Sequence, residues 1–119
     1  MRTAATLAIL AGLAGCQSVT PAAPRFIALG TEPFWSIAVE PGTLTWSSPE
    51  SPSGTLFRAT AKQDGAAIVY SGILSGQPLR LRIEPGTCSD GMSDQVYPYS
   101  ATVTRSTEVL KGCARLAGR

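Results

Sequence analysis

Polar side chains that could hold a ligand gather in the segment from Cys88 to Pro98. Asp90, Ser93 and Asp94 supply oxygen atoms of the kind that Ca²⁺ prefers, but the spacing lacks the alternating ligands and the distal glutamate of an EF-hand loop. Asp90-Gly91 is also a turn signal, because short polar side chains in turns bond nearby backbone amides. We therefore predict a structural turn and no metal site here, with a calcium site as the alternative.

A second segment, from Gly30 to Trp35, combines a carboxylate with two aromatic rings around a proline that forces a turn. Trp35 fits the alternating pattern of the residues that follow it, which predicts that its indole packs in a core. The alternative places Glu32 and Phe34 at the rim of a barrel, in a pocket or a protein contact. The candidate binding residues of the two segments are Glu32, Phe34, Trp35, Asp90, Asp94 and Tyr97.

The residue types argue against catalysis. The chain contains no histidine, which excludes Ser-His-Asp and Cys-His nucleophilic sites and histidine-ligated zinc. Neither Ser71 nor Ser93 lies in a G-x-S-x-G elbow. A carboxylate pair would require Glu32 to meet Asp90 or Asp94 in space. We expect a protein that is not an enzyme, with no catalytic residue and no cofactor.

The N-terminal residues have the three parts of an export signal. Arg2 gives a positive start, an apolar stretch runs from Ala4 to Leu13, and small residues precede Cys16. A transmembrane helix needs roughly 20 apolar residues, about twice what is present. The segment therefore predicts a cleaved signal peptide, the alternative being a soluble protein with an apolar N-terminus.

Leu13-Ala14-Gly15-Cys16 resembles the lipobox of bacterial lipoproteins. The resemblance implies that Cys16 receives a diacylglycerol, that the signal is cleaved before it, and that the new amino terminus is acylated. Several acyl chains on one cysteine make a stable anchor, whereas one chain holds only marginally. Gln17 is not the Asp that retains many lipoproteins in the inner membrane, so the resemblance favours the outer membrane, facing the periplasm, over the inner membrane.

The remaining cysteines form an even pair. If the lipid takes Cys16, then Cys88 and Cys113 are left in a compartment that permits disulfides. Their closed loop of about 25 residues corresponds to roughly 3.5 kcal/mol in the loop-entropy model. We predict this disulfide, with two free buried thiols as the alternative.

The chain divides into three parts. These are a signal peptide (residues 1–15), the lipidated cysteine with a short, stiff, proline-containing tether (residues 16–24) and a single domain (residues 25–119). The chain has ten Lys and Arg against eight Asp and Glu, and Arg2 lies in the signal. The domain is thus almost neutral and lacks the clustered basic surface of a nucleic-acid-binding protein, so we expect no nucleic-acid partner.

Apolar and polar residues alternate in several short runs, which predicts strands with one buried face. Trp35, Ile37 and Val39 form one such buried set, and the others are Phe57, Ala59 and Ala61; Leu79, Leu81 and Ile83; and Tyr99, Ala101 and Val103. Further strands are predicted near residues 26–30, 44–46, 67–74 and 109–113. We predict an all-β domain of about eight short antiparallel strands, closed into a small barrel or arranged as a sandwich.

Turn residues separate these runs. Asp64-Gly65 predicts a type I′ hairpin with positive φ at both central positions. Pro41-Gly42 and Pro85-Gly86 stand in matching settings, and each predicts a type II hairpin turn.

The two chemical segments together resemble a family of small bacterial lipoproteins and periplasmic proteins. Its members share an early G-[TN]-E-P-F-W segment, here Gly30 to Trp35, and a late C-x-D-G-M-S-x-x-x-Y-P segment, here Cys88 to Pro98, followed by Gly112-Cys113. The resemblance implies an exported β-domain with the cysteine pair, and no reaction. A vaguer similarity extends to META/HslJ-like domains and to lipoprotein inhibitors of lysozyme.

We therefore expect a membrane-anchored, noncatalytic binding domain of the cell envelope, held through the lipid on Cys16, whose ligand is a protein, a glycan or a small molecule. The alternatives are a structural or stress-related lipoprotein without a dedicated ligand, and a lysozyme-inhibitor-like protein. A groove lined by aromatic rings or by the Glu32 or Asp90 carboxylate favours binding, whereas a filled barrel without a groove favours the structural role.

Overall fold

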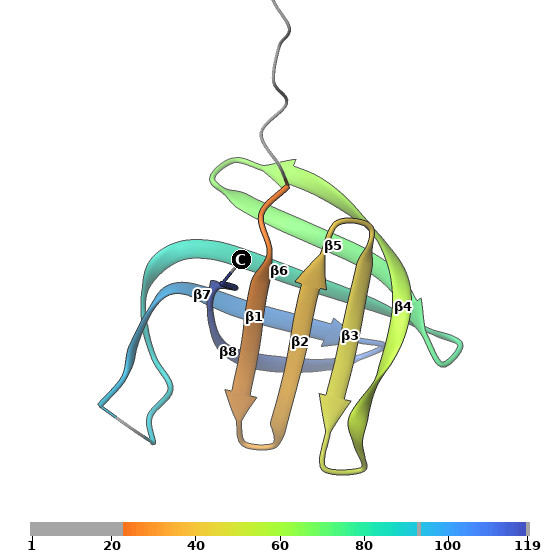
Figure 1. Cartoon of the computed structure of the whole chain (residues 1–119), viewed down its shortest axis with the longest axis horizontal. Coiled ribbons are helices and arrows are strands. Elements are labelled where there is room, and N and C mark those ends of the chain that lie inside the picture. Colours follow the sequence, from red (N-terminus) through yellow and green to blue (C-terminus); the bar gives the residue numbers. More distant parts are fainter. Residues whose placement is uncertain (1–22, 93, 119) are drawn as a thin grey trace, which may run out of the picture.

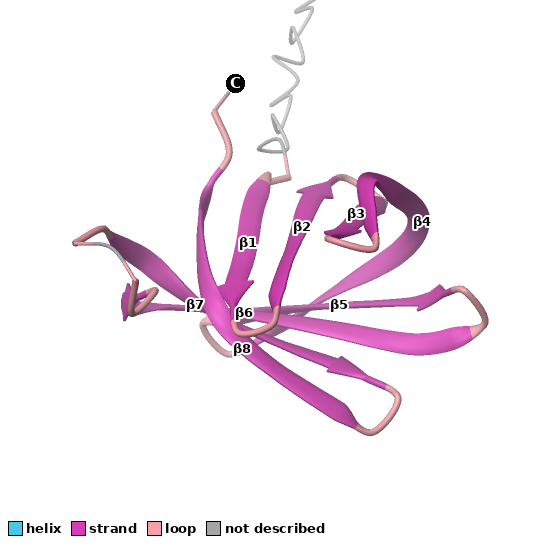
Figure 2. Cartoon of the chain, turned by 90° about the horizontal axis from the view of Figure 1, so that it is seen from below, coloured by secondary structure: helices cyan, strands magenta, loops and turns pink. Residues whose placement is uncertain are grey.

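The computed structural model describes residues 23–92 and 94–118, which form a closed barrel of eight antiparallel strands (Figure 1). The strands are β1 (Phe26–Thr31), β2 (Phe34–Glu40), β3 (Thr43–Ser48), β4 (Ser51–Asp64), β5 (Ala67–Leu74), β6 (Gln77–Ser89), β7 (Val96–Arg105) and β8 (Glu108–Leu116). Each strand pairs with the next, and β8 pairs with β1 to close the barrel. The predicted all-β barrel is confirmed, and Figure 2 shows strands and loops throughout. However, β4 and β6, at 14 and 13 residues, are longer than the short strands predicted.

The core lies inside the barrel and follows the predicted alternation on most strands. Ile37, Leu81 and Val103 are completely buried, and their chain neighbours Ala38, Arg82 and Thr102 are not. An eight-stranded barrel is just wide enough for side chains to fill its interior. The inward side chains of neighbouring strands therefore form one continuous core.

Strand β4 departs from the predicted pattern because it changes partner halfway along. Its last pair with β3 is Thr43–Arg58, and its first pair with β5 is Ala59–Gly72. The Ala59 N–H donates a hydrogen bond to the Gly42 carbonyl (3.0 Å) at this point. Beyond it, the β4–β5 hairpin extends past the β2–β3 turn, and Ala61, predicted to be buried, is exposed.

One predicted turn is confirmed and another differs in type. Pro41 and Gly42 connect β2 to β3, with Gly42 at φ 79° as a type II turn requires. Asp64 pairs with Ala67, so the central residues of the β4–β5 turn are Gly65 and Ala66 and not Asp64 and Gly65. Gly65 has φ 61° and Ala66 has no positive φ, which is the pattern of a type II′ turn.

The second Pro-Gly pair is not a hairpin turn, so that prediction was wrong. Strand β6 continues through Pro85 and Gly86 to Ser89. Pro85 opposes Tyr99 and Cys88 opposes Tyr97, so three steps along β6 match two along β7, which is a β-bulge. Pro85 has no N–H to donate to the hydrogen bonds between β6 and β7, and Gly86 has φ 151°. Proline and glycine within a strand are typical of a bulge as well as of a turn.

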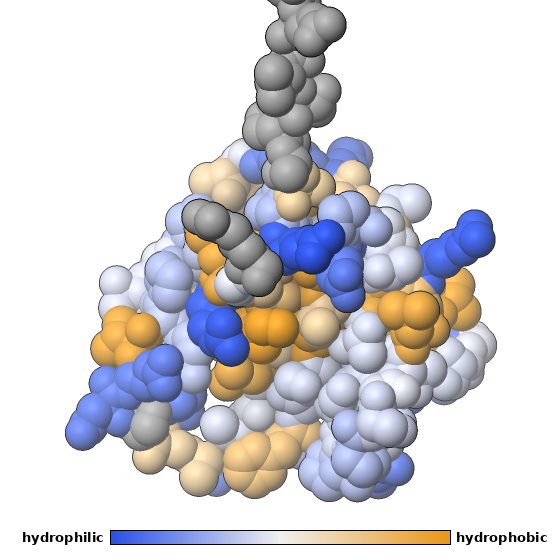
Figure 3. Space-filling model, viewed as in Figure 1, coloured by the Kyte–Doolittle hydropathy of each residue, from blue (hydrophilic) through white to orange (hydrophobic). Residues whose placement is uncertain are grey.

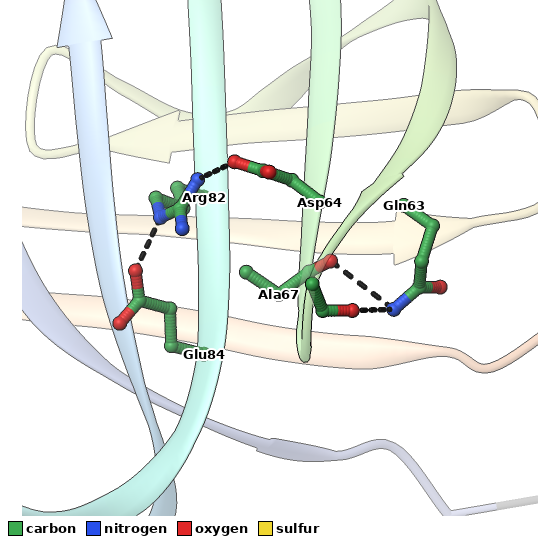
Figure 4. Close-up of polar contacts among 6 residues, drawn as sticks. Gln63, Asp64, Ala67, Arg82 and Glu84 are labelled. Carbon is green, nitrogen blue, oxygen red and sulfur yellow. Dashed lines mark hydrogen bonds and ion pairs between the residues drawn. The ribbon is translucent and has the colours of Figure 1, made fainter.

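Polar contacts lie at the turn of the β4–β5 hairpin, and one of them joins it to β6 (Figure 4). The Gln63 side-chain amide donates to the carbonyls of Gly65 (3.0 Å) and Ala67 (3.2 Å). The Arg82 guanidinium contacts the carboxylates of Asp64 (2.6 Å) and Glu84. This guanidinium lowers the pKa of Asp64 through a hydrogen bond and charge attraction, and the pKa of Arg82 is raised by its bonds to Asp64 and Glu84.

Candidate functional site

The far ends of β6 and β7, with the residues between them, form an arm (residues 85–92 and 94–98) that leaves the barrel wall after the bulge. Figure 1 shows it at the left, curving down beside β1. The predicted disulfide between Cys88 and Cys113 is confirmed, with the two Cα atoms 5.6 Å apart, and it fastens the arm to β8. Successive residues of a strand point to opposite faces, and Ala114 next to Cys113 belongs to the core. The Cys113 side chain therefore points away from the barrel interior, and yet the residue is only 1% exposed. The arm covers it.

The arm brings the two segments identified in the sequence together. The Thr31 hydroxyl, at the end of β1, donates a hydrogen bond to the backbone carbonyl of Asp90 (3.3 Å), 59 residues later. Glu32 and Pro33 form the two-residue turn that follows Thr31, and their peptide bond is cis. The β1–β2 turn and the tip of the arm are therefore neighbours at one end of the barrel.

The tip of the arm is a turn of the kind that its sequence predicts. The Asp90 carboxylate accepts a hydrogen bond from the Met92 N–H (3.0 Å), and the Ser89 hydroxyl accepts one from the Gly91 N–H (3.2 Å). Gly91 has φ 77°, a conformation that favours glycine. Within residues 23–92 and 94–118, no group of three or more His, Cys, Asp or Glu side chains is arranged to hold a metal ion.

A cleft of about 410 Å³ lies between the arm and the outer face of the barrel. Leu29 and Thr31 of β1 form part of its wall, and Figure 3 shows apolar surface over the middle of β1 with hydrophilic surface above it and to its left. Ser89 and Asp90 contribute from the arm. The remaining outward side chains of the cleft are Ser100, Thr102 and Lys111. Hydroxyls, an ammonium group and a carboxylate in one cleft suit a polar ligand that offers both hydrogen-bond donors and acceptors.

Sequence reasoning did not identify Ser100, Thr102 and Lys111 as site residues. Their alternation with buried neighbours marks them as outward residues of a strand, and outward polar residues on strands are normally solvated. The signal that would have found them is the disulfide, because Thr102 pairs with Lys111 and Ser100 pairs with Cys113. The residues beside Cys113 on the outer face are those that the arm overhangs.

Trp35 packs in the core beneath this site, with 4% of its surface exposed. A Cβ added to Gly30 would lie 2.0 Å from the Trp35 indole nitrogen, and one added to Gly112 would lie 2.9 Å from another atom of the same ring. The indole therefore fills the space that two glycines leave. On its other side it stacks on Trp46, with ring centroids 6.2 Å apart, and the guanidinium of Arg105 lies 5.3 Å from the Trp46 ring centroid.

The other candidate residues divide between surface and interior. Phe34 begins β2 at the rim of the barrel with 56% of its surface exposed, and Glu32 beside it is exposed. Asp90 is half-buried and Asp94 is exposed. Tyr97 is buried, so its ring packs and does not present a surface to a ligand. The structure thus leaves Glu32, Phe34 and Asp94 exposed, and Glu32, Phe34 and the half-buried Asp90 lie close to the contact between the two segments.

None of the described residues forms a helix with the length and hydrophobicity that crossing a membrane requires. Comparison of the chain with family models, with curated proteins and with solved structures found no match.

Proposed function

We propose that this chain is a lipid-anchored protein of the bacterial cell envelope whose barrel is a noncatalytic module that binds a protein partner. One observation carries the binding role. Phe34, 56% exposed, pairs with Thr31, and Met92, 63% exposed, donates its N–H to Asp90, so both lie close to the contact between Thr31 and Asp90, which also line the cleft under the arm.

A protein partner fits this surface because apolar and polar features lie next to each other. Partner-binding surfaces combine a few exposed apolar anchors with a polar, hydrogen-bonding surround. Beside the polar cleft, a second hollow lined by Leu29, Phe34 and Pro49 is mainly apolar. The barrel interior is filled by side chains, so it is not the site in which a large ligand is enclosed. A partner that covers the rim contacts both kinds of surface at once.

The lipid anchor is proposed from the sequence. Leu13-Ala14-Gly15-Cys16 lies outside the described residues, and its resemblance to a lipobox supports lipidation of Cys16. The disulfide between Cys88 and Cys113 is consistent with export, because structural disulfides persist in oxidising compartments. Outer-membrane attachment facing the periplasm remains the proposed location.

Site-specific photo-crosslinking in living cells tests the binding role. A photoreactive amino acid replaces Phe34 or Met92 in the full chain, and Ile73 serves as the matched control because it is an equally exposed apolar residue (59%) on β5. We expect the same partner protein to be captured from positions 34 and 92 and not from position 73. Adding Lys111→Glu, which reverses the charge in the cleft, should weaken the capture.

Capture of the same proteins from all three positions, or of none from positions 34 and 92, would contradict the proposal. The barrel is then better described as a structural envelope protein without a dedicated protein partner. Circular dichroism of each purified variant shows whether the barrel has folded, so that a lost crosslink is not mistaken for a lost fold.

A further inference from the structure

The opposite end of the barrel has a hollow of about 320 Å³ that the proposed function does not use. It lies where the β4–β5 hairpin extends past the β2–β3 turn. Ala59 and Ala61 line it from β4, and Ile68 and Tyr70 line it from β5. Figure 1 shows this hairpin at the upper end of the barrel, beside the point where the chain enters β1.

The hollow exists because the side chains at this end of the barrel are small, whereas large side chains fill the interior at the opposite end. At the β1–β2 end, Trp35, Trp46 and Arg105 stack across the interior. At this end, Tyr70 faces Ala61 across the β4–β5 pair, and an alanine leaves space that a larger residue would occupy. Ala23 and Pro24 line the hollow from the N-terminal side, so several segments enclose it.

Tyr70 gives the hollow a polar group that the barrel itself does not use. Its side chain is 93% buried, with 7% of its surface exposed. Among the described residues its hydroxyl has no hydrogen-bond partner. Burial raises the pKa of Tyr70, so the hydroxyl is neutral near pH 7 and can both donate and accept. No buried side-chain oxygen or nitrogen of the described residues lacks a partner, so solvent reaches this hydroxyl, and a ligand in the hollow can replace the water that it meets.

The rim of the hollow sets the charge of the ligand. Glu40, exposed at the end of β2, is the ionisable residue of the lining besides Tyr70, and within the described chain it forms no ion pair. Like charges repel, so a carboxylate or phosphate on the ligand is disfavoured, by a modest amount because Glu40 is exposed to solvent. The size fits a small molecule, because an apolar cavity of about 150 Å³ already admits benzene.

We infer that the barrel end formed by Ala59, Ala61, Ile68 and Tyr70 is a binding site for a small, uncharged amphiphile: a short apolar body with one hydrogen-bonding group that meets the Tyr70 hydroxyl. This site is separate from the surface around Phe34 and Met92, and it does not depend on the proposed protein partner.

Nuclear magnetic resonance titration of the full chain with 1-octanol tests the site. We expect saturable shifts of the backbone signals of Ala61, Ile68 and Tyr70. Octanoate, which has the same chain with a carboxylate, should bind at least about threefold more weakly at pH 7. Glu40→Gln should reduce the difference in affinity between octanol and octanoate.

Three variants separate the hollow from the rest of the fold. Ala61→Trp fills it and should lower octanol affinity about tenfold or more. Tyr70→Phe removes only the hydroxyl and should lower it about three- to tenfold. Ala66→Trp makes the same change as Ala61→Trp at an exposed turn of the same hairpin, outside the hollow, and should leave affinity within about twofold.

Each variant's spectrum reports whether it is folded before octanol is added. Shifts confined to the cleft under the arm, equal binding of octanol and octanoate, or equal loss in Ala61→Trp and Ala66→Trp would overturn the inference. Octanol affinity unchanged in Tyr70→Phe would also overturn it, since the Tyr70 hydroxyl is the group expected to bond the polar end of the ligand.

Discussion

At the scale of single residues, the position of Trp35 depends on two glycines that are 82 residues apart in the sequence. Gly30 lies opposite Trp35 on β1, and Gly112 lies on β8 beyond it. A side chain at either position would overlap the indole, so glycine is required here for close approach. This explains physically why the early segment begins with glycine and why glycine precedes Cys113.

Gly112→Ala tests this requirement. The added Cβ would lie 2.0 Å from the Leu29 carbonyl oxygen, a backbone atom that cannot move aside cheaply. We expect the free energy of unfolding to fall by about 2–3 kcal/mol, measured by urea denaturation. Gly118→Ala is the matched control, because a Cβ there meets no atom within 4 Å. An equal effect in both variants would show that the close approach of the chain at position 112 does not require glycine.

At the scale of elements, the arm is held in place by a covalent bond and a small number of polar contacts. The disulfide joins β6 to β8 across the outer face, and Thr31 contacts Asp90 farther along the arm. The bulge at Pro85 and Gly86 lets β6 leave the barrel wall before it reaches Cys88. The cleft is therefore a product of the bulge and the disulfide acting together.

Replacing both cysteines, Cys88→Ala with Cys113→Ala, should release the arm while the barrel stays folded. The two cysteines are 25 residues apart in the sequence. For a loop of this length, the loop-entropy model predicts that removing the disulfide lowers the free energy of unfolding by about 3.5 kcal/mol. Hydrogen exchange should accelerate in residues 85–98 and not in β2 or β3. Uniformly faster exchange across all strands would instead show that the disulfide stabilises the barrel as a whole.

The ion pair between β4 and β6 predicts a dependence of stability on pH. The pKa of Asp64 is lower in the folded chain than its ordinary value of 3.8, because Arg82 stabilises the carboxylate. Its contribution is therefore complete above about pH 4 and is lost as the pH falls through the lowered folded value. Thermal unfolding of Asp64→Asn should lose part of this acid dependence, by a small amount because both side chains are exposed.

Arg82→Gln provides the control through a double-mutant cycle. With Arg82 absent, Asp64→Asn should no longer change the acid dependence of the melting temperature. An undiminished effect of Asp64→Asn in the Arg82→Gln background would mean that the Asp64 carboxylate responds to another group.

At the scale of the whole molecule, the chain enters the barrel at the end opposite its proposed partner surface. β1 runs from Phe26 at the entry to Thr31 at the rim that carries Phe34. The nine residues 16–24 of the proposed tether span at most about 30 Å. Anchoring at Cys16 would thus keep the Tyr70 end near the membrane and direct the Phe34 rim away from it.

Cys16→Ala in the full chain tests the anchor. We expect loss of metabolic labelling by a fatty-acid analogue and loss of membrane retention after cell fractionation, with the barrel still folded because Cys16 precedes β1. Ser18→Ala should keep both properties, since it leaves the acceptor thiol in place. Retention of the label in Cys16→Ala would show that the lipid, if present, is attached elsewhere.

The strands were predictable from the sequence because they depend on local patterns, and the disulfide was predictable because two cysteines are left once Cys16 is assigned to the lipid. Alternation of buried and outward residues on strands such as β2 and β6 reflects a geometric period of two, and the type II turn at Pro41-Gly42 follows from the φ preferences of those residues. The exposure of Ala61 was not predictable, since it depends on where β4 changes partner.

The sequence by itself determined an all-β chain with a cysteine pair and two chemical segments, since residue type and spacing dictate these properties. Only the tertiary structure decided that Pro85-Gly86 is a bulge, that Thr31 and Asp90 meet, and that Ser100, Thr102 and Lys111 line a cleft. Each of these depends on barrel closure and on the disulfide, which bring together residues that are distant in the chain. The same closure places the buried ring of Tyr70 beside a hollow at the other end.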